Sequence, residues 1–272
     1  MPLNAFENDT PDCISVAILG AGHAGRGLAG YLSLQGVDVS LFNRTRQNIE
    51  AIIKKGGISV HGIVRKFAPI SIITDNIARA IQDRDIIIIT VPAQAHKFFA
   101  QEIAPHLESD QTLLLMPGRT GGALEFTQTL RAFSGIQDVL VGEAQTFSFV
   151  SRISRPNEVL ISKVKNSVHV SAFPAMYNDQ LMKRLNTLPL PFHVSDSVLE
   201  TSINNVGALL HPTPTILCAG IIESKGGSYN HYHDAISPSV GRLIERMDYE
   251  RVLVAEHFDV THISAQLVTR FV

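Results

Sequence analysis

Residues 14–25 read ISVAILGAGHAG, and this short stretch decides the fold. The β-branched run over residues 14–19 is typical of a buried strand. Gly20, Gly22 and Gly25 follow with the spacing GxGxxG, and small and apolar residues then recur at helical spacing. A strand, a tight glycine turn and a helix in this order form the fingerprint of a Rossmann domain, which binds dinucleotides.

Each glycine has its own task in such a turn. Gly20 permits the tight bend, Gly22 lets the backbone approach a pyrophosphate, and Gly25 lets helix and strand pack closely. Unpaired N–H groups and the positive end of the helix dipole, at His23 and Ala24, would then face the phosphates. We therefore predict that the chain binds a nicotinamide dinucleotide and transfers hydride. A glycine turn without a ligand is the alternative.

Outward from the turn, short apolar strands alternate with helices up to about residue 145, and IIIITVP at residues 86–92 is the clearest buried strand. This alternation predicts an α/β fold with a doubly wound parallel sheet that is covered on both faces. Residues 146–174 are expected to be extended, and the last part of the chain helical. We predict a Rossmann domain over residues 1–190 and a smaller all-helical domain over residues 191–272.

The composition excludes several classes of protein. The chain has 272 residues, of which 45% are hydrophobic and 18% charged, so it can bury a sizeable core. Its net charge of -2 and its pI near 6.6 provide no basic field for nucleic acid or for an anionic membrane surface. The longest apolar runs are too short to cross a bilayer.

The chain start and the cysteines predict a cytoplasmic protein. Residues 1–13 have no basic start and no apolar stretch, so we expect a loose tail rather than a secretory signal. Cys13 and Cys218 lack CxxC spacing, which disfavours a disulfide framework and a structural zinc site. We expect both to be reduced thiols.

The end of the second expected strand bears on which coenzyme is bound. An acidic residue there would accept hydrogen bonds from the ribose 2′-hydroxyl and indicate NAD. The sequence instead has Asn43, Arg44 and Thr45, with no carboxylate to repel a 2′-phosphate. Arg44 is suited to stack on adenine and to pair with that phosphate, helped by Thr45 or Arg46. This favours NADP over NAD, although solvated arginines at a helix start would look the same.

Two further turns belong to the same edge of the sheet. Val91, Pro92 and Ala93 end a core strand and are expected near the nicotinamide, because crevice ligands lie beyond the carboxyl ends of strands. Residues 117–122, PGRTGG, end the following strand. Arg119 in that turn is an anion ligand or a surface charge.

His211 lies in NNVGALLHPTP, residues 204–214. Histidine is the side chain best suited to exchange a proton at neutral pH, and a His-Pro helix end is an unusual place for a core histidine. From the residues alone, both a catalytic and a core role stay open. His231 and His233 alternate in a polar loop, so we expect them to face solvent, and we predict no metal site.

Six stretches of the chain, from about residue 14 onward, form a combined pattern. They are GAGHAGRGLAGYLSLQG (20–36), VPAQAH (91–96), MPGRTGGALEF (116–126), VGEAQTFSF (141–149), NNVGALLHP (204–212) and SPSVGRLIERMDYERV (237–252). Together they resemble the NAD/NADP octopine/nopaline dehydrogenase family, the opine dehydrogenases. The first stretch is shared with many Rossmann enzymes, whereas PGRTGGALEF and the last two stretches are more specific to this family.

The resemblance implies a Rossmann domain followed by an all-helical domain. It also implies the reductive condensation of a 2-oxo acid with the amino group of an amino acid, through an imine that receives hydride from NAD(P)H. By the same resemblance His211 acts as the acid and base, and Asn204 or Asn205 lies near the nicotinamide.

The chain departs from the family pattern at its end. Family members continue past the MDYERV helix with an arginine that holds a substrate carboxylate and an aspartate that partners the catalytic histidine. Asp248, Asp259 and Arg270 are poor counterparts, and the chain stops at residue 272. We therefore expect a C-terminally shortened member with intact coenzyme binding and weak or absent condensation, unless a second subunit supplies the missing groups. Exposed apolar surface on a shortened domain would favour a homodimer.

Two other interpretations stay open. A ketopantoate-reductase-like enzyme or a hydroxyacid dehydrogenase usually relies on a lysine in the helical domain. Lys225, in the loop-like SKGGS, is the only lysine there, which disfavours that interpretation. The second is a non-catalytic dinucleotide-binding protein, which the short end supports and His211 argues against.

Overall fold

The structure, a computed structural model, describes residues 14–134 and 139–264. The chain divides into two compact units, the first ending at Val198 and the second beginning at Leu199. Predictions for the following positions lie outside the described residues: residues 1–13 with Cys13, and Arg270 at the chain end.

The first unit contains a sheet of eight strands and a sheet of four within the described residues. In spatial order the larger sheet consists of β12 (Phe192–Val194), β11 (Val168–Phe173), β8 (Leu140–Ala144), β7 (Thr112–Leu115), β6 (Ile86–Ile89), β1 (Ser15–Leu19), β2 (Asp38–Phe42) and β5 (Ile72–Thr74). The smaller sheet consists of β4 (Lys66–Pro69), β3 (Gly57–Gly62), β10 (Glu158–Val164) and β9 (Phe149–Arg155).

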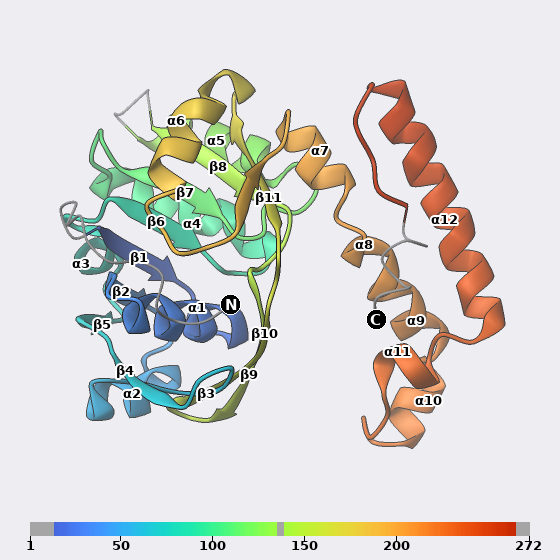
Figure 1. The fold of residues 1–272 in the computed structure, drawn as a ribbon, viewed down its shortest axis with the longest axis horizontal. Helices are drawn as coiled ribbons and strands as arrows, with labels where there is room; N and C mark the ends of the chain where they lie inside the picture. Colours follow the sequence, from blue (N-terminus) through green and yellow to red (C-terminus); the bar gives the residue numbers. More distant parts are fainter. Residues whose placement is uncertain (1–13, 135–138, 265–272) are drawn as a thin grey trace. The chain divides into compact units, whose positions relative to one another are not determined.

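The strands from β5 to β8 confirm the predicted Rossmann fold. They run parallel in the order β5-β2-β1-β6-β7-β8, so the strand order reverses between β1 and β6 (Figure 1). The sheet is not parallel throughout, because β11 runs antiparallel to β8. The chain between these two strands forms the β9–β10 hairpin instead of a crossover helix, and only a crossover returns a strand in the same direction.

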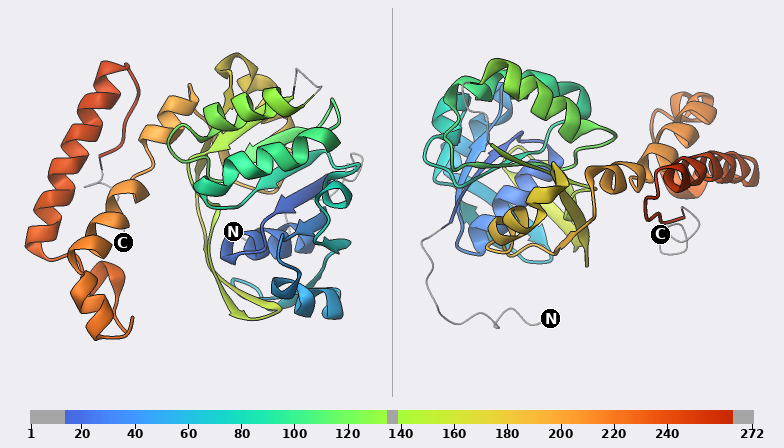
Figure 2. Two further views of the ribbon diagram at one scale, coloured as in Figure 1. Left: turned by 180° about the vertical axis from the view of Figure 1, so that it is seen from behind. Right: turned by 90° about the horizontal axis from the view of Figure 1, so that it is seen from above.

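Helices cover both faces of the larger sheet because successive side chains of a strand alternate between the faces. Val16 and Ile18 of β1 share a buried cluster with α1, α6 and the smaller sheet. Ala17 and Leu19 share another with α3, α4 and α5, and Figure 2 shows α4 and α5 together on one side of the strands. The helices are α1 (His23–Leu34), α2 (Glu50–Lys55), α3 (Ile77–Ile81), α4 (His96–Ile103), α5 (Gly122–Phe133) and α6 (Asn178–Leu185).

The sequence pattern leaves two features of this unit unpredicted. Strand β12 pairs with β11, so the sheet extends past residue 190, where we expected the domain boundary. Helix α6 buries only Leu181 and Leu185, which is too short a pattern for hydrophobic periodicity to reveal.

The second unit is helical, as predicted, but its first part is broken into short pieces. Pro212 opens α9, and a proline cannot donate the backbone hydrogen bond that would continue α8. Its helices are α7 (Val198–Ile203), α8 (Gly207–Leu210), α9 (Pro212–Leu217), α10 (Ala219–Ser224), α11 (His231–Asp234) and α12 (Pro238–His257). None of the described helices is long and apolar enough to cross a membrane.

Candidate functional site

The glycine turn after β1 is fixed by backbone and side-chain hydrogen bonds. Gly20 has a φ of +116°, in the left-handed region that favours glycine, and its N–H donates to the Phe42 carbonyl oxygen over 2.9 Å. The Ala21 N–H donates to Oδ1 of Asn43 over 3.2 Å, and Oγ1 of Thr90 donates to the Gly20 carbonyl oxygen over 2.9 Å. The turn is thus tied to the ends of β2 and β6, and it lies between β1 and β6, where the strand order reverses.

Gly22 and Gly25 are constrained in different ways. A Cβ at Gly25 would lie 1.7 Å from the carbonyl oxygen of Gly20, so only glycine lets α1 approach β1 this closely. A Cβ at Gly22 would meet no atom within 4 Å. Gly22 is the N-cap of α1 and brings no side chain to cap the first N–H groups. Open space at a helix N-terminus fits a pyrophosphate, which needs that close backbone approach.

The buried side chain of Arg26 stabilises the glycine turn through hydrogen bonds. Its side chain is 5% exposed, and burial lowers its pKa. Nε donates to the Ala21 carbonyl oxygen over 2.8 Å, and Nη1 donates to the Pro156 carbonyl oxygen over 2.6 Å. Nη2 donates to the Asn48 carbonyl oxygen. One guanidinium therefore joins the glycine turn, the segment after β2 and the β9–β10 hairpin.

His23 and Ala24 lie in the first turn of α1, as predicted for residues that face the phosphates. His23 is exposed, and its Nδ1 accepts a hydrogen bond from the Ile153 N–H over 2.8 Å. The neutral ring therefore carries its proton on Nε2. Oγ of Ser151 donates to the His23 carbonyl oxygen over 3.0 Å, so β9 fixes this helix start.

The residues that follow β2, predicted to bind the coenzyme, make different contacts in the structure. Asn43 braces the turn, since its Nδ2 donates to the Thr45 carbonyl oxygen over 2.9 Å. Arg46 pairs with Asp75, Nη1 to Oδ1 at 3.0 Å. The Cζ of Arg44 lies 5.3 Å from the centroid of the Phe98 ring. Arg44 is thus a cation on an aromatic face, and Arg46 has a carboxylate partner.

Val91, Pro92 and Ala93 follow β6, and the structure brings the first of them to the glycine turn. A Cβ at Gly20 would lie 2.9 Å from Cγ1 of Val91, so the two segments are in direct contact. Pro92 caps a 3-10 turn that begins at Ala93. The three residues occupy the carboxyl edge of the sheet at the switch point, where a dinucleotide lies in this fold.

The PGRTGG turn encloses a buried polar group that the sequence pattern does not reveal. Glu143 of β8 is fully buried, and its Oε2 accepts a hydrogen bond from the Ala123 N–H over 2.9 Å at the start of α5. The His96 ring lies near Gly122, and burial lowers the pKa of His96. A carboxylate that accepts from the first turn of α5 fixes the turn that carries Arg119.

Lys165 is a second group that sequence reasoning misses. Its Nζ donates to Oγ1 of Thr146 over 2.7 Å. Burial lowers the pKa of Lys165, and the nearby charge of Arg119 lowers it further. Burial also lowers the pKa of Arg119, whose φ is +67°. Two partly buried cations therefore lie near each other, and Thr146 and Arg119 follow adjacent strands at their carboxyl ends.

In the second unit, His211 lies at the junction of α8 and α9 and is exposed. Its Nε2 lies 2.9 Å from the hydroxyl of Tyr232. His231 is half-buried and bonded to Tyr229 and to the Leu210 carbonyl oxygen, so the expectation that it faces solvent is wrong.

His233 is exposed and pairs with Asp234 at 3.3 Å. Within residues 14–134 and 139–264, no group of three or more histidine, cysteine, aspartate or glutamate side chains is placed to hold a metal ion. Cys218 is a buried free thiol.

The paired asparagines before α8 have structural contacts. Asn204 is 5% exposed, its Nδ2 donates to the Thr261 carbonyl oxygen over 2.8 Å, and its Oδ1 accepts from the Ile263 N–H over 2.9 Å. Asn205 is also buried. Asp248 forms a buried ion pair with Arg251, at 2.7 Å between Oδ1 and Nη2. Asn204 therefore anchors the segment after α12, and the predicted role of Asn205 beside a nicotinamide stays a prediction.

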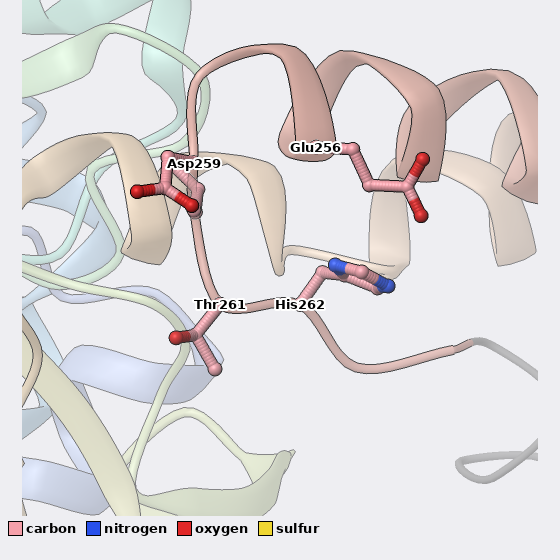
Figure 3. A pocket seen from close by; sticks show the side chains of 5 residues that line it. Glu256, Asp259, Thr261 and His262 are labelled. Carbon is pink, nitrogen blue, oxygen red and sulfur yellow. The ribbon is translucent and has the colours of Figure 1, made fainter.

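A hollow of about 430 Å³ lies at the end of α12, lined by Glu256, Asp259, Val260, Thr261 and His262. In Figure 3 the carboxylate of Asp259 points away from Glu256 and His262. The lining offers no convergent set of polar groups, and none of the residues predicted for coenzyme or acid–base chemistry belongs to it. We therefore assign no function to this hollow.

Comparison with known proteins agrees with this geometry. Residues 194–270 match the family described as "NAD/NADP octopine/nopaline dehydrogenase, alpha-helical domain", and residues 16–148 match "Ketopantoate reductase PanE/ApbA". The chain is 37% identical over 246 residues to the opine dehydrogenase of Arthrobacter sp. (strain 1C), which covers 90% of this chain and 68% of that protein.

Solved structures of low identity show the same fold. A structure of octopine dehydrogenase in complex with NADH and agmatine has a TM-score of 0.68 at 20% identity, covering 89% of this chain and 64% of that one. NADP+-bound yersinopine dehydrogenase has a TM-score of 0.70 at 18% identity, covering 92% and 65%. The chain thus spans about two thirds of the length of these relatives.

The different surroundings of Gly22 and Gly25 predict that substitution by alanine affects coenzyme affinity at one position and stability at the other. Gly22→Ala is expected to weaken NADPH and NADH binding at least tenfold, measured by fluorescence titration, and to change stability by less than about 1 kcal/mol. Gly25→Ala is expected to destabilise by about 1–3 kcal/mol, measured by urea unfolding, because its Cβ meets the Gly20 carbonyl. Unchanged coenzyme affinity in Gly22→Ala would contradict the assignment of the turn.

Proposed function

The chain belongs to the opine dehydrogenase family, whose members are NAD(P)-dependent dehydrogenases, and we propose that it catalyses the NAD(P)H-dependent reductive condensation of a 2-oxo acid with the amino group of an amino acid. The observation that carries the proposal is the open N-terminus of α1 at Gly22, held at the switch point of the sheet. The ketopantoate reductase alternative is not favoured, since the matched helical domain is of the opine type.

His211 performs the proton steps of this proposal. Its imidazole accepts a proton from the substrate ammonium, and the free amine then attacks the carbonyl carbon of the oxo acid. One proton passes from the attacking nitrogen to the former carbonyl oxygen, which gives a neutral carbinolamine. The imidazolium then protonates the hydroxyl, which leaves as water as the protonated C=N bond forms. A bound reduced nicotinamide supplies the hydride that reduces the imine carbon.

Arg119 and Lys165 are proposed to hold the carboxylate of the 2-oxo acid. Each is partly buried, and each lowered pKa reflects the cost of burying a cation. A carboxylate between them would offset their mutual repulsion, and Thr146 already orients the ammonium of Lys165. Both lie in the first unit, which carries the coenzyme turn.

NADP is proposed as the preferred coenzyme. Asn43 and Thr45 brace the turn and Arg46 is paired with Asp75, whereas Arg44 lies against Phe98. A guanidinium that already stacks on an aromatic ring is arranged to pair with a 2′-phosphate.

A homodimer and a cytoplasmic location stay predictions. Support for self-association comes from large apolar side chains that the second unit exposes: Ile216, Leu217, Leu253, Val254 and Phe258. The free thiol of Cys218 is compatible with a reducing compartment.

The proposed activity is tested by turnover. With NADPH, pyruvate and a mixture of amino acids, the protein is expected to oxidise coenzyme in an amino-acid-dependent way. His211→Asn should lower kcat by about 100-fold or more because the proton steps lose their acid and base, while exposed His106→Asn in the first unit should leave kcat unchanged. No amino-acid-dependent oxidation by the native protein would refute the proposed function.

Coenzyme choice is tested at Arg44. Arg44→Glu is expected to weaken NADPH binding about 10–100-fold, since a charge-assisted hydrogen bond is replaced by repulsion, and to weaken NADH binding much less, since NADH loses only the stacking on adenine. The matched control is Arg79→Glu, which changes an exposed arginine on α3. Equal losses for both coenzymes would argue against a phosphate-binding Arg44.

Lys165→Met is expected to raise KM for the 2-oxo acid about tenfold or more and to leave KM for the coenzyme unchanged. In the native protein, oxo-acid affinity should fall as pH rises, because the cation is lost. The fall should begin below the usual range of a lysine pKa, since burial lowers the pKa of Lys165. Exposed Lys183→Met on α6 serves as the control, and a pH-independent KM would count against a carboxylate ligand here.

A further inference from the structure

Three aromatic side chains lie together at the start of α11, and two of them lie beside the His211 ring. They are Tyr229, His231 and Tyr232, named here the aromatic clamp. The His231 and Tyr232 rings meet edge to face with centroids 5.0 Å apart, and the His211 ring lies 6.3 Å from each of them. All four residues belong to the second unit.

The hydrogen bonds of His231 define its protonation pattern. Nε2 of His231 lies 3.2 Å from the carbonyl oxygen of Leu210, which can only accept, so Nε2 carries a proton. In the neutral ring Nδ1 is then the acceptor, and the Tyr229 hydroxyl donates to it over 2.8 Å. Because Leu210 directly precedes His211, this pair fixes the backbone that carries the His211 side chain.

Tyr232 acts on the His211 ring itself. Its hydroxyl lies 2.9 Å from Nε2 of His211. A Cβ added at Gly207 would lie 3.3 Å from Cε1 and 3.4 Å from Nδ1 of the ring, so a glycine at this position leaves room for the imidazole beside α8. The ring therefore lies against its own helix, and the clamp binds its Nε2.

The clamp is itself braced at its helix start. Oδ1 of Asn230 accepts a hydrogen bond from the His233 N–H over 3.3 Å, and the Asn230 N–H donates to Oδ2 of Asp234 over 2.9 Å. Ala235, which follows, is buried in the core of the second unit. The tyrosine hydroxyl is thus presented by a closed turn that is anchored to the core.

We propose that Tyr232 is the positioning residue of His211, holding Nε2 of the imidazole so that one ring orientation is presented to the substrate. The proposal rests on the proposed function, in which His211 performs the proton steps. Tyr232 bonds to the histidine and is assigned no proton transfer to substrate. The role of the remaining clamp residues is to fix the backbone next to His211.

The test compares Tyr232→Phe, which removes only the hydroxyl, with Tyr249→Phe on the exposed side of α12. In the condensation assay, Tyr232→Phe is expected to lower kcat about tenfold, the loss of one hydrogen bond, with KM for the coenzyme unchanged. Tyr249→Phe should match the native protein. In nitrogen NMR of the full chain, with the His211 signals identified by their absence in His211→Asn, Tyr232→Phe should shift the Nε2 resonance.

The NMR result separates this proposal from the proposed function. A native protein without condensation activity, but with a His211 Nε2 resonance that depends on Tyr232, would refute the function and support the positioning role. An active protein whose kcat and Nε2 resonance are the same in Tyr232→Phe as in the native chain would overturn the positioning role and leave the function standing. A loss of folding in Tyr232→Phe, seen as a lower unfolding midpoint than in Tyr249→Phe with no separate Nε2 shift, would also overturn it.

Discussion

The close approach of α1 to the ends of β1 and β6 is the constraint on which the rest of the first unit depends. The Gly20 carbonyl oxygen occupies the space that a Cβ at Gly25 would need, and Thr90 donates to that same oxygen. The backbones of α1 and β1 therefore meet directly, with only the Thr90 hydroxyl of the neighbouring segment beside them. The first N–H groups of α1 reach the carboxyl edge of the sheet, which is where an anion can use them.

Arg26 affects the electrostatics of the glycine turn. A carbonyl oxygen that faced the open space at Gly22 would repel a phosphate, and the Ala21 carbonyl directly precedes Gly22. The buried guanidinium donates a hydrogen bond to the Ala21 carbonyl oxygen over 2.8 Å, so this oxygen faces the protein interior. The same cation bonds to the Pro156 carbonyl oxygen, so the β9–β10 hairpin is tied to the glycine turn.

The sequence predicts the parts of the fold that local pattern encodes. Strand–glycine–helix order places Gly20, Gly22 and Gly25, and the alternation of strands and helices predicts the Rossmann sheet. The sequence pattern does not predict contacts between separate segments, such as Ile153 with His23 or Lys165 with Thr146, because neither residue type nor spacing indicates which segments meet. The antiparallel β11 and the β12 pairing are missed for the same reason, since register is a property of the assembled sheet.

The second unit shows how a residue can be identified from its motif while its environment cannot. The resemblance in NNVGALLHP identifies His211. For His231, the polar surrounding sequence predicts solvent exposure, but in the structure the His231 side chain is bonded to the Leu210 carbonyl oxygen. Two contacts that orient the His211 ring and its backbone come from within this unit. These two hydrogen bonds depend on the fold of the second unit, in which the start of α11 packs beside the junction of α8 and α9.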